Sequence, residues 1–286
     1  MFTILIPTLN NLPYLKICIN SIIKTSYKEN EILVHVNEDT DHDIRDFLND
    51  KKIKFTYTSK NIGLCSAINI IAKKANFSYL IYAHDDMYFC PNWEKALVDE
   101  INKINHNSFY ISGSMIEPNS GHIQFNCGES IDEFNENKLL KNLNNLQIKD
   151  HQGSHFAPHC VHKKTWDSVG GFSEEFNPGI GSDPDFNMKL WKIGCRIFKG
   201  LNDFKVYHFG SLTTRKNKNV KQNRGDNTFL LKWGISTYFF KKYYLRSRTL
   251  YNGPLKDPEK NFKYYVELFK CKIVFCFQLI LKKLNK

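Results

Sequence analysis

The chain has 286 residues, of which 42% are hydrophobic and 14% aromatic, so it can bury the core of one large α/β domain or two small ones, and global disorder is excluded. It carries 40 Lys and Arg residues against 29 Asp and Glu, and the net charge of +11 favours an anionic partner: nucleic acid, an acidic membrane surface or a phosphate-bearing substrate. Its eight cysteines form no C-x-x-C pair, which excludes zinc-knuckle and thioredoxin-like motifs and predicts a reducing, cytoplasmic location.

The first hundred residues alternate between short apolar strands and helical patterns. The N-terminus, MFTILIPTLN, has no basic stretch before its apolar run, so we expect no signal peptide, and no run in the chain reaches the roughly 18 apolar residues of a membrane-spanning helix. Strands are predicted at 2–6, 31–36, 53–58 and 78–83, with helices at 12–24, 43–48 and 62–75. Pro7 is expected to end the first strand. Near-continuous apolar strands predict a parallel sheet covered by helices on both faces.

Polar residues follow each of the four predicted strands, at 7–10, 37–39, 59–61 and 84–86. In parallel sheets, ligands bind beyond the carboxyl ends of the strands, so these four clusters should line one rim. The last cluster holds two adjacent carboxylates, Asp85 and Asp86, which are hard oxygen ligands suited to Mg²⁺ or Mn²⁺. The alternative is that they cap a helix beginning near Pro91 or lie in a solvated turn.

The pattern changes after residue 108. A fifth strand is predicted at 109–116, followed by a polar, Asn-rich segment with a helix around 136–146. A further helix is predicted from Asp183 as N-cap, with Pro184 at its first position and Gly194 at its end. Two closing strands are expected at 196–200 and 204–209. The remainder, 211–286, is strongly basic and aromatic and shows no clear new domain.

Six segments in chain order resemble the family 2 glycosyltransferases of GT-A fold: TILIPTLNN, VNEDTD, KNIGLCSAIN, LIYAHDDMYFCPNW, GGFSEEFNPGIGSDPDFNMKLWKIG and VYHFGS. The resemblance covers about residues 1–210. It implies an α/β, Rossmann-like, mostly parallel central sheet with helices on both faces, followed by a basic helical extension at 211–286. Residues 1–108 would then form the nucleotide-sugar half and 109–210 the acceptor and catalytic half. The implied reaction is inverting transfer of a sugar from a nucleotide-diphospho-sugar to a hydroxyl of a glycan, glycolipid or other glycoconjugate.

The resemblance also implies which residues bind the nucleotide sugar. These are Pro7, Thr8, Asn10, Glu38, Asp39, Asn61, Gly63, Asn69, His84, Asp85 and Asp86. The implied cofactor is Mn²⁺ or Mg²⁺, held first by Asp85, then by Asp86, with His208 as a further ligand. The family motif is Asp-x-Asp, and Ala83 stands in place of its first carboxylate. Ile68 stands where many relatives carry an Arg before Asn69.

Asp183 is the catalytic base that the resemblance implies, taking the proton of the acceptor hydroxyl. Ser182 occupies a position that is usually acidic, and Asp185 is the fallback base, although it is expected to face a basic neighbour. The acceptor side is assigned to His159, Gly181, Ser182, Asp185 and Trp191. Among the histidines at 151, 155, 159 and 162 no metal-site spacing occurs, so they are acceptor-side or structural residues. His208 is either a ligand or a satisfied core residue.

The C-terminal third leaves several interpretations open. The basic run at 215–224 either closes over the diphosphate as a lid or forms a solvated loop, and NTFLLKWGIS is expected to pack as a helix beside the site. The segment FKCKIVFCFQLILKKLNK predicts a helix on an anionic membrane surface, on the catalytic domain or on a second subunit.

Two further functions compete with glycosyl transfer. A binding-only relative is encouraged by Ala83 and Ser182. A sugar nucleotidyltransferase would need a Gly-rich, basic loop after the first strand, which PTLNNLPY lacks. Nucleic-acid binding is not expected, because the basic residues crowd the C-terminal third instead of interleaving with aromatics on exposed strands.

Overall fold

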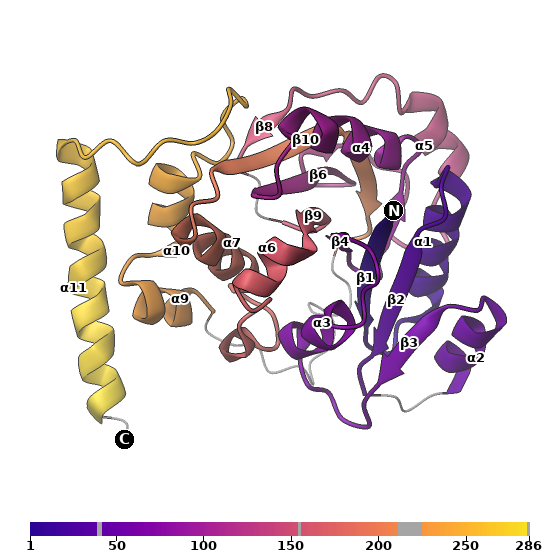
Figure 1. Ribbon diagram of the computed structural model, residues 1–286, viewed down its shortest axis with the longest axis horizontal. Coiled ribbons are helices and arrows are strands. Elements are labelled where there is room, and N and C mark those ends of the chain that lie inside the picture. The colour runs from indigo at the N-terminus through magenta and orange to yellow at the C-terminus, as the bar shows by residue number, and fades with distance from the viewer. Residues whose placement is uncertain (39–41, 154–155, 211–224, 285–286) are drawn as a thin grey trace.

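The computed structural model describes residues 1–38, 42–153, 156–210 and 225–284. Its centre is one mixed sheet with the strand order β3-β2-β1-β4-β9-β6-β10-β5 (Figure 1). Helices cover both faces of this sheet, so the expected α/β fold class is confirmed.

The N-terminal half follows the predicted alternation. Strands β1 (Phe2–Thr8), β2 (Glu31–Val36), β3 (Lys54–Tyr57) and β4 (Tyr79–Tyr82) are parallel, and helices α1 (Leu12–Thr25), α2 (His42–Asp50) and α3 (Leu64–Ala72) connect them. The expectation that Pro7 ends the first strand was wrong, because Pro7 pairs with His35 and β1 continues to Thr8. The nitrogen of Pro7 faces the β4 side, where pairing ends at Leu5, so no ladder hydrogen bond is lost there.

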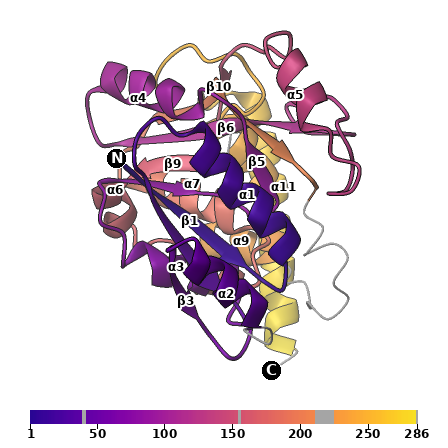
Figure 2. The same ribbon diagram turned by 90° about the vertical axis from the view of Figure 1, so that its right-hand side faces the viewer.

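The second half adds antiparallel strands that the apolar pattern did not predict. Strand β9 (His159–His162) lies antiparallel between β4 and β6 (Phe109–Glu117), and β5 (Met87–Phe89) lies antiparallel to β10 (Ile197–His208). The remaining elements here are β7 (Ile123–Gln124), β8 (His151–Gln152), α4 (Trp93–Ile104), α5 (Glu136–Asn142), α6 (Lys163–Ser168), η1 (Glu174–Phe176) and α7 (Ser182–Lys192). Helices α1 and α4 meet on one face, where the Trp93 indole donates to Thr25, while α3, α6 and α7 cover the other (Figures 1 and 2).

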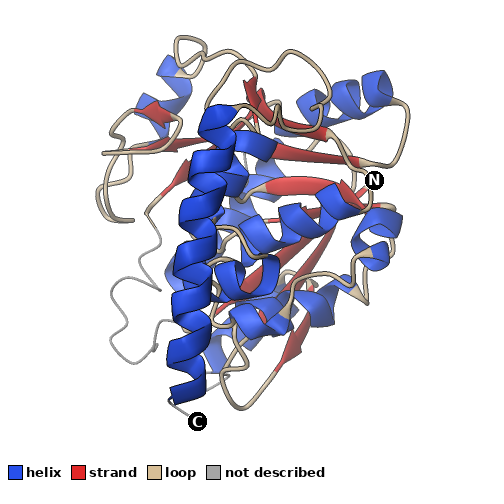
Figure 3. Cartoon of the chain, turned by 90° about the vertical axis from the view of Figure 1, so that its left-hand side faces the viewer, coloured by secondary structure: helices blue, strands red, loops and turns tan. Residues whose placement is uncertain are grey.

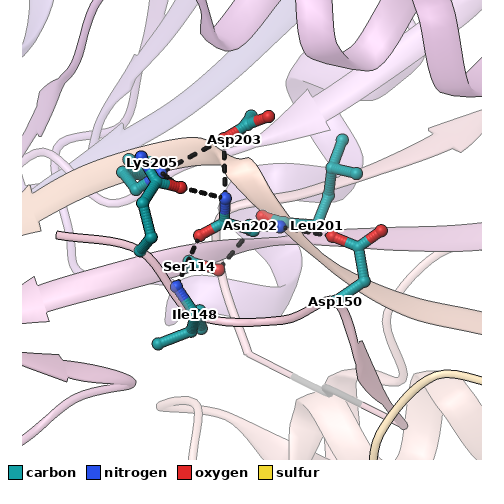
Figure 4. A network of polar contacts seen from close by, with 8 residues as sticks. Ser114, Ile148, Asp150, Leu201, Asn202, Asp203 and Lys205 are labelled. Carbon is teal, nitrogen blue, oxygen red and sulfur yellow. Dashed lines mark hydrogen bonds and ion pairs between the residues drawn. The ribbon is translucent and has the colours of Figure 1, made fainter. Parts of the chain in front are cut away.

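The two predicted closing strands are one strand, β10, with an irregularity in its middle. Leu201 pairs with Gly113 and Lys205 with Ser114, so residues 202–204 have no partner on β6. A polar network holds this bulge (Figure 4): Asn202 N donates to Asp150 at 2.9 Å, and Ser114 Oγ donates to the Leu201 carbonyl at 3.0 Å. The strand then resumes and ends at His208.

The C-terminal segment is helical: α9 (Gly225–Trp233), α10 (Thr237–Phe239), η2 (Phe240–Tyr244) and α11 (Phe262–Leu284). Helix α11 runs along the outside of the molecule beside α9 and α10 (Figures 1 and 3). Within the described residues, none of the helices combines the length and the apolar character needed to cross a bilayer.

Candidate active site

The loops after the parallel strands meet at one rim, as expected. Thr8 Oγ1, at the end of β1, donates to Asp85 Oδ2 at 2.7 Å, after β4. Asn37 Nδ2, after β2, donates to Asn61 Oδ1 at 2.9 Å, after β3. The parallel arrangement explains this, because strands that share a direction bring their carboxyl ends to the same edge.

Two rim residues have an unusual backbone conformation. Asn10 and Glu38 adopt left-handed φ angles of 48° and 60°, which non-glycine residues rarely do. Strained backbone conformations of this kind are frequent at ligand sites, where contacts with the surrounding loops hold them in place.

Asp39, His155 and the basic run at 215–224 lie outside the described residues.

A cluster of two histidines and one carboxylate lies behind the rim. Asp86 Oδ1 is 3.3 Å from His208 Nε2 and 3.9 Å from His84 Nδ1. One potential ligand atom from each of these three residues lies within 4.8 Å of the other two. Asp85, the first-ranked ligand from the sequence, is not one of these three residues: its Oδ2 accepts a hydrogen bond from Thr8 beside them.

Burial and charge set the protonation of this cluster. Burial, followed by the neighbouring Asp86 charge, raises the pKa of Asp85 to about 7. Burial lowers the pKa of His84 to about 4, so its ring is neutral at neutral pH and offers a lone pair. Burial alone would disfavour a charged His208, but the carboxylates of Asp86 and Glu117 raise its pKa to about 9.

The donor atoms of this cluster fit a divalent cation. They combine the Asp86 carboxylate oxygen with the neutral ring of His84 and with His208, whose ring is protonated at neutral pH and would release its proton when a cation binds. This set suits Mn²⁺ better than Mg²⁺, which prefers all-oxygen ligands. Glu117 Oε1 lies 2.5 Å from His208 Nδ1 and so fixes the orientation of the ring. Glu117 was not among the residues predicted from the sequence, although it directly follows a predicted apolar strand, as the other rim residues do.

Asp183 lies in the first turn of α7. The expectation that it caps this helix was wrong: Gly181, with a left-handed φ of 86°, occupies the N-cap, and Ser182 Oγ donates to the Gly179 carbonyl at 2.6 Å. The Asp183 Oδ1 atom is buried and accepts no hydrogen bond from any described residue. Burial therefore raises the pKa of Asp183 to about 7.

Tyr82 links the position of Asp183 to that of the histidine cluster. Burial raises the pKa of the Tyr82 phenol well above its usual value, and the charges of Asp183 and Asp86 act in the same direction. The Tyr82 ring also contacts the His84 ring, with 5.3 Å between the ring centroids.

Asp185 has a different role from Asp183. Its carboxylate is fully buried and accepts hydrogen bonds from Ser173 Oγ at 2.6 Å and from Trp233 Nε1 at 2.8 Å. Lys232 Nζ lies 3.0 Å from the same carboxylate, so the expected basic neighbour is present. These contacts tie α9 to the helix that carries Asp183.

The other residues assigned to the acceptor side are buried to different degrees. His159 is fully buried on β9, with Nδ1 3.0 Å from Tyr110 Oη, and burial lowers its pKa to about 3. Trp191 is 5% exposed and packs between Phe198 and Tyr244, with the Arg196 guanidinium 4.0 Å from its ring centre. The structure thus brings His159 beneath α7, whereas Trp191 belongs to the hydrophobic core.

Gly63 and Asn69 hold helix α3 against the segment before α7. A Cβ atom on Gly63, whose φ is 81°, would lie 2.4 Å from the Asn177 side chain, which accepts a hydrogen bond from Cys65 N. The Asn69 amide donates to the Phe172 carbonyl at 2.8 Å and accepts from its N–H at 2.9 Å. Both residues assigned to the nucleotide therefore also fix the approach of α3 to this segment.

Comparisons with known proteins bear on the family and the fold of this chain. Residues 3–161 match the family described as glycosyl transferase family 2. An uncharacterized glycosyltransferase of Rickettsia conorii is 35% identical over 118 residues, which cover 40% of this chain and 19% of the relative. The chain therefore spans about a fifth of that curated relative.

Solved glycosyltransferase structures have a similar fold. S. aureus TarS, residues 1–349 in complex with UDP-GlcNAc, aligns with a TM-score of 0.55 and 15% identity, covering 94% of this chain and 79% of that one. GalNAc-T7 with UDP, GalNAc and Mn²⁺ aligns with a TM-score of 0.58 and 15% identity, covering 85% of this chain and 58% of that one. At this identity the likeness concerns the fold. Since the family match spans more than half of the residues, the chain belongs to glycosyl transferase family 2 and has the GT-A fold.

Proposed function

We propose that this protein is an inverting glycosyltransferase that moves a sugar from a nucleotide-diphospho-sugar to a hydroxyl group of a glycan, glycolipid or other glycoconjugate. The observation that carries the proposal is the Asp183 carboxyl, whose Oδ1 is buried without a hydrogen-bond partner among the described residues and whose pKa is raised to about 7. A base with a pKa near the working pH is effective, because it is ionised in much of the enzyme and still accepts a proton readily.

Asp183 takes the proton of the acceptor hydroxyl as that oxygen attacks the anomeric carbon. The attack comes from the side opposite the diphosphate, so the configuration at that carbon inverts. The electron pair of the breaking bond leaves with the diphosphate, and the proton remains on Asp183. Ser182 holds the turn before α7 through its bond to Gly179, and Asp185 anchors α7 to α9.

The cation that we propose is Mn²⁺ or Mg²⁺, held by Asp86, His208 and His84, with Asp85 beside them. When bound, it would neutralise the negative charge of the departing diphosphate. Glu117 orients His208, and Thr8 orients Asp85. The Mn²⁺ ion in the GalNAc-T7 structure supports testing this ion first.

The nucleotide contacts remain those that the resemblance implies, at the ends of the parallel strands. We propose that residues 1–108 hold the donor, that 109–210 supply the base and the acceptor side, and that 211–286 extend this core. The TarS and GalNAc-T7 structures contain UDP or UDP-GlcNAc, which supports a uridine nucleotide as the first candidate.

Calorimetric titration of UDP, GDP, dTDP and CMP, each with and without Mn²⁺, tests the donor half. Asp86→Asn should remove the metal-dependent part of the affinity, while Asp183→Asn should keep nucleotide affinity and abolish hydrolysis of the donor sugar. Asp46→Asn, on the exposed face of α2, is the matched control and should change neither. If none of the four nucleotides binds, the proposal is refuted.

A binding-only relative is the second candidate, favoured by Ala83 in the acidic motif and by Ser182 before Asp183. It predicts nucleotide binding without turnover of any donor sugar. In that case, Asp183→Asn would leave the already absent hydrolysis unchanged.

A further inference from the structure

Helix α11 presents a continuous apolar stripe to solvent. Its inward side, with Tyr264 and Cys271 buried and Leu268 packed on the core, faces α9 and α10. At 100° per residue, the opposite side carries seven large apolar side chains. Their exposed fractions are 83% for Phe262, 37% for Val266, 66% for Phe269, 54% for Ile273, 57% for Phe277, 56% for Ile280 and 76% for Leu284.

The stripe is bordered by positive charge. Lys263 and Lys270 lie along one side of it and Lys283 along the other, whereas the ammonium group of Lys272 reaches back toward Gly234, after α9. Glu267 is the acidic residue of α11, and its carboxylate lies 2.5 Å from Lys242 Nζ on η2, turned toward the body of the molecule. The outward side of α11 therefore combines apolar and cationic groups without an acidic side chain among its described residues.

The combination of apolar and cationic groups on α11 distinguishes between two possible partners: a second copy of this helix and an anionic lipid bilayer. The apolar residues recur three and four positions apart, a spacing that also suits a helix from a second copy. Pairing with an identical helix would bring the lysine rows of both copies together with no carboxylate between them, which is destabilising. A bilayer containing anionic lipids instead accepts the apolar stripe and attracts the lysines on both sides.

We propose that α11 lies in the surface of an anionic lipid bilayer, with its apolar stripe toward the acyl chains and its lysines at the headgroups. The helix runs along the outside of the molecule, in front of the rest of the chain in the view of Figure 3. Its exposed side chains lie on the side opposite the one that packs against α9 and α10. The inference goes beyond glycosyl transfer and stands whether or not the protein turns over a donor sugar.

Co-sedimentation of the full chain with vesicles tests the proposal, using phosphatidylcholine alone and phosphatidylcholine with phosphatidylglycerol. Binding is expected to the anionic vesicles and to be weaker at high salt. The triple variant F269S/I273S/I280S should lose binding. The triple variant K263Q/K270Q/K283Q should weaken it by roughly a hundredfold, because each lysine contributes roughly fivefold.

The matched control removes three positive charges elsewhere, with Lys51, Lys73 and Lys74 replaced by Gln, and should bind within about threefold of the original chain. Thermal unfolding of each variant checks that the fold is retained, since the substituted side chains are exposed. Absence of vesicle binding by the original chain would overturn the proposal. So would binding that survives F269S/I273S/I280S, or a concentration-dependent dimer in sedimentation velocity that the same substitutions dissociate.

Discussion

Replacing Asp183 by Asn is expected to change the pH dependence of stability as well as activity. Burial raises the pKa of this carboxyl from 3.8 to about 7, so the folded protein binds a proton that the unfolded chain has released between these values. The contribution of this carboxyl to the free energy of unfolding therefore falls as pH rises from about 4 to 7 and is constant above that. Asn carries no charge, so the Asp183→Asn variant does not lose this free energy of unfolding as pH rises.

The size of the effect follows from the pKa. A rise in pKa from 3.8 to about 7 corresponds to a loss of about 4 kcal/mol in the free energy of unfolding if the carboxyl is fully removed from water. The Asp183 side chain is partly accessible to solvent, so the loss is smaller than this upper value. The Asn variant should thus equal the original protein near pH 4 and be more stable by about 2–4 kcal/mol at pH 8. All other titrating groups are shared, so they cancel in the difference between the two proteins.

Urea unfolding of both proteins at pH 4.5, 6 and 8 measures this difference directly. Donor hydrolysis by the original protein should rise with pH through about 7, and the variant should lose at least a hundredfold in kcat at every pH, because the base is absent. Parallel stability curves for the two proteins across this pH range would refute the argument that Asp183 is buried without a partner.

Three further predictions concern other contacts. Gly63→Ala should destabilise the fold by more than 2 kcal/mol, because the φ of Gly63 is 81° and a Cβ there would lie 2.4 Å from Asn177. The control Gly170→Ala, at a φ of 72° with no described atom within 4 Å, should cost only about 1 kcal/mol. Equal losses for the two variants in urea unfolding would contradict the steric argument. Asp185→Leu should cost about 3 kcal/mol in the same assay, because it leaves Lys232, Trp233 and Ser173 without the carboxylate that they share. A loss under 1 kcal/mol would exclude an anchoring role for Asp185. Glu117→Gln should weaken Mn²⁺ binding by roughly 10- to 100-fold in calorimetry while leaving nucleotide affinity without metal unchanged, and an unchanged Mn²⁺ affinity would remove Glu117 from the proposed site.

Local pattern was sufficient for the N-terminal half of the fold. The strand at Glu31–Val36 begins and ends at the residues that the apolar run predicts, and the three connecting helices lie where the spacing indicated. Each of these elements buries its own apolar run, so a short window of sequence contains the information that forms it. The rim followed from the same windows, because parallel strands necessarily share the edge at which they end.

Local pattern failed where partners come from distant parts of the chain. Strand β9 has only four residues, and it exists because β4 and β6 hydrogen-bond to it on either side. The capping role expected of Asp183 went to Gly181, whose left-handed backbone is a better fit to the turn before α7 than the carboxylate.

By itself, the sequence determined the alternating strands and helices, the acidic rim and the family resemblance, since these depend on neighbours a few residues apart. Only the tertiary structure decided that Asp86 meets His208 and that Glu117 stands behind it, because these residues come from the ends of three different strands. Only the tertiary structure, too, left Asp183 Oδ1 without a hydrogen-bond partner among the described residues while giving Asp185 three partners. Burial and partner geometry are properties of the packed molecule, and they separate two carboxylates that the sequence places two residues apart.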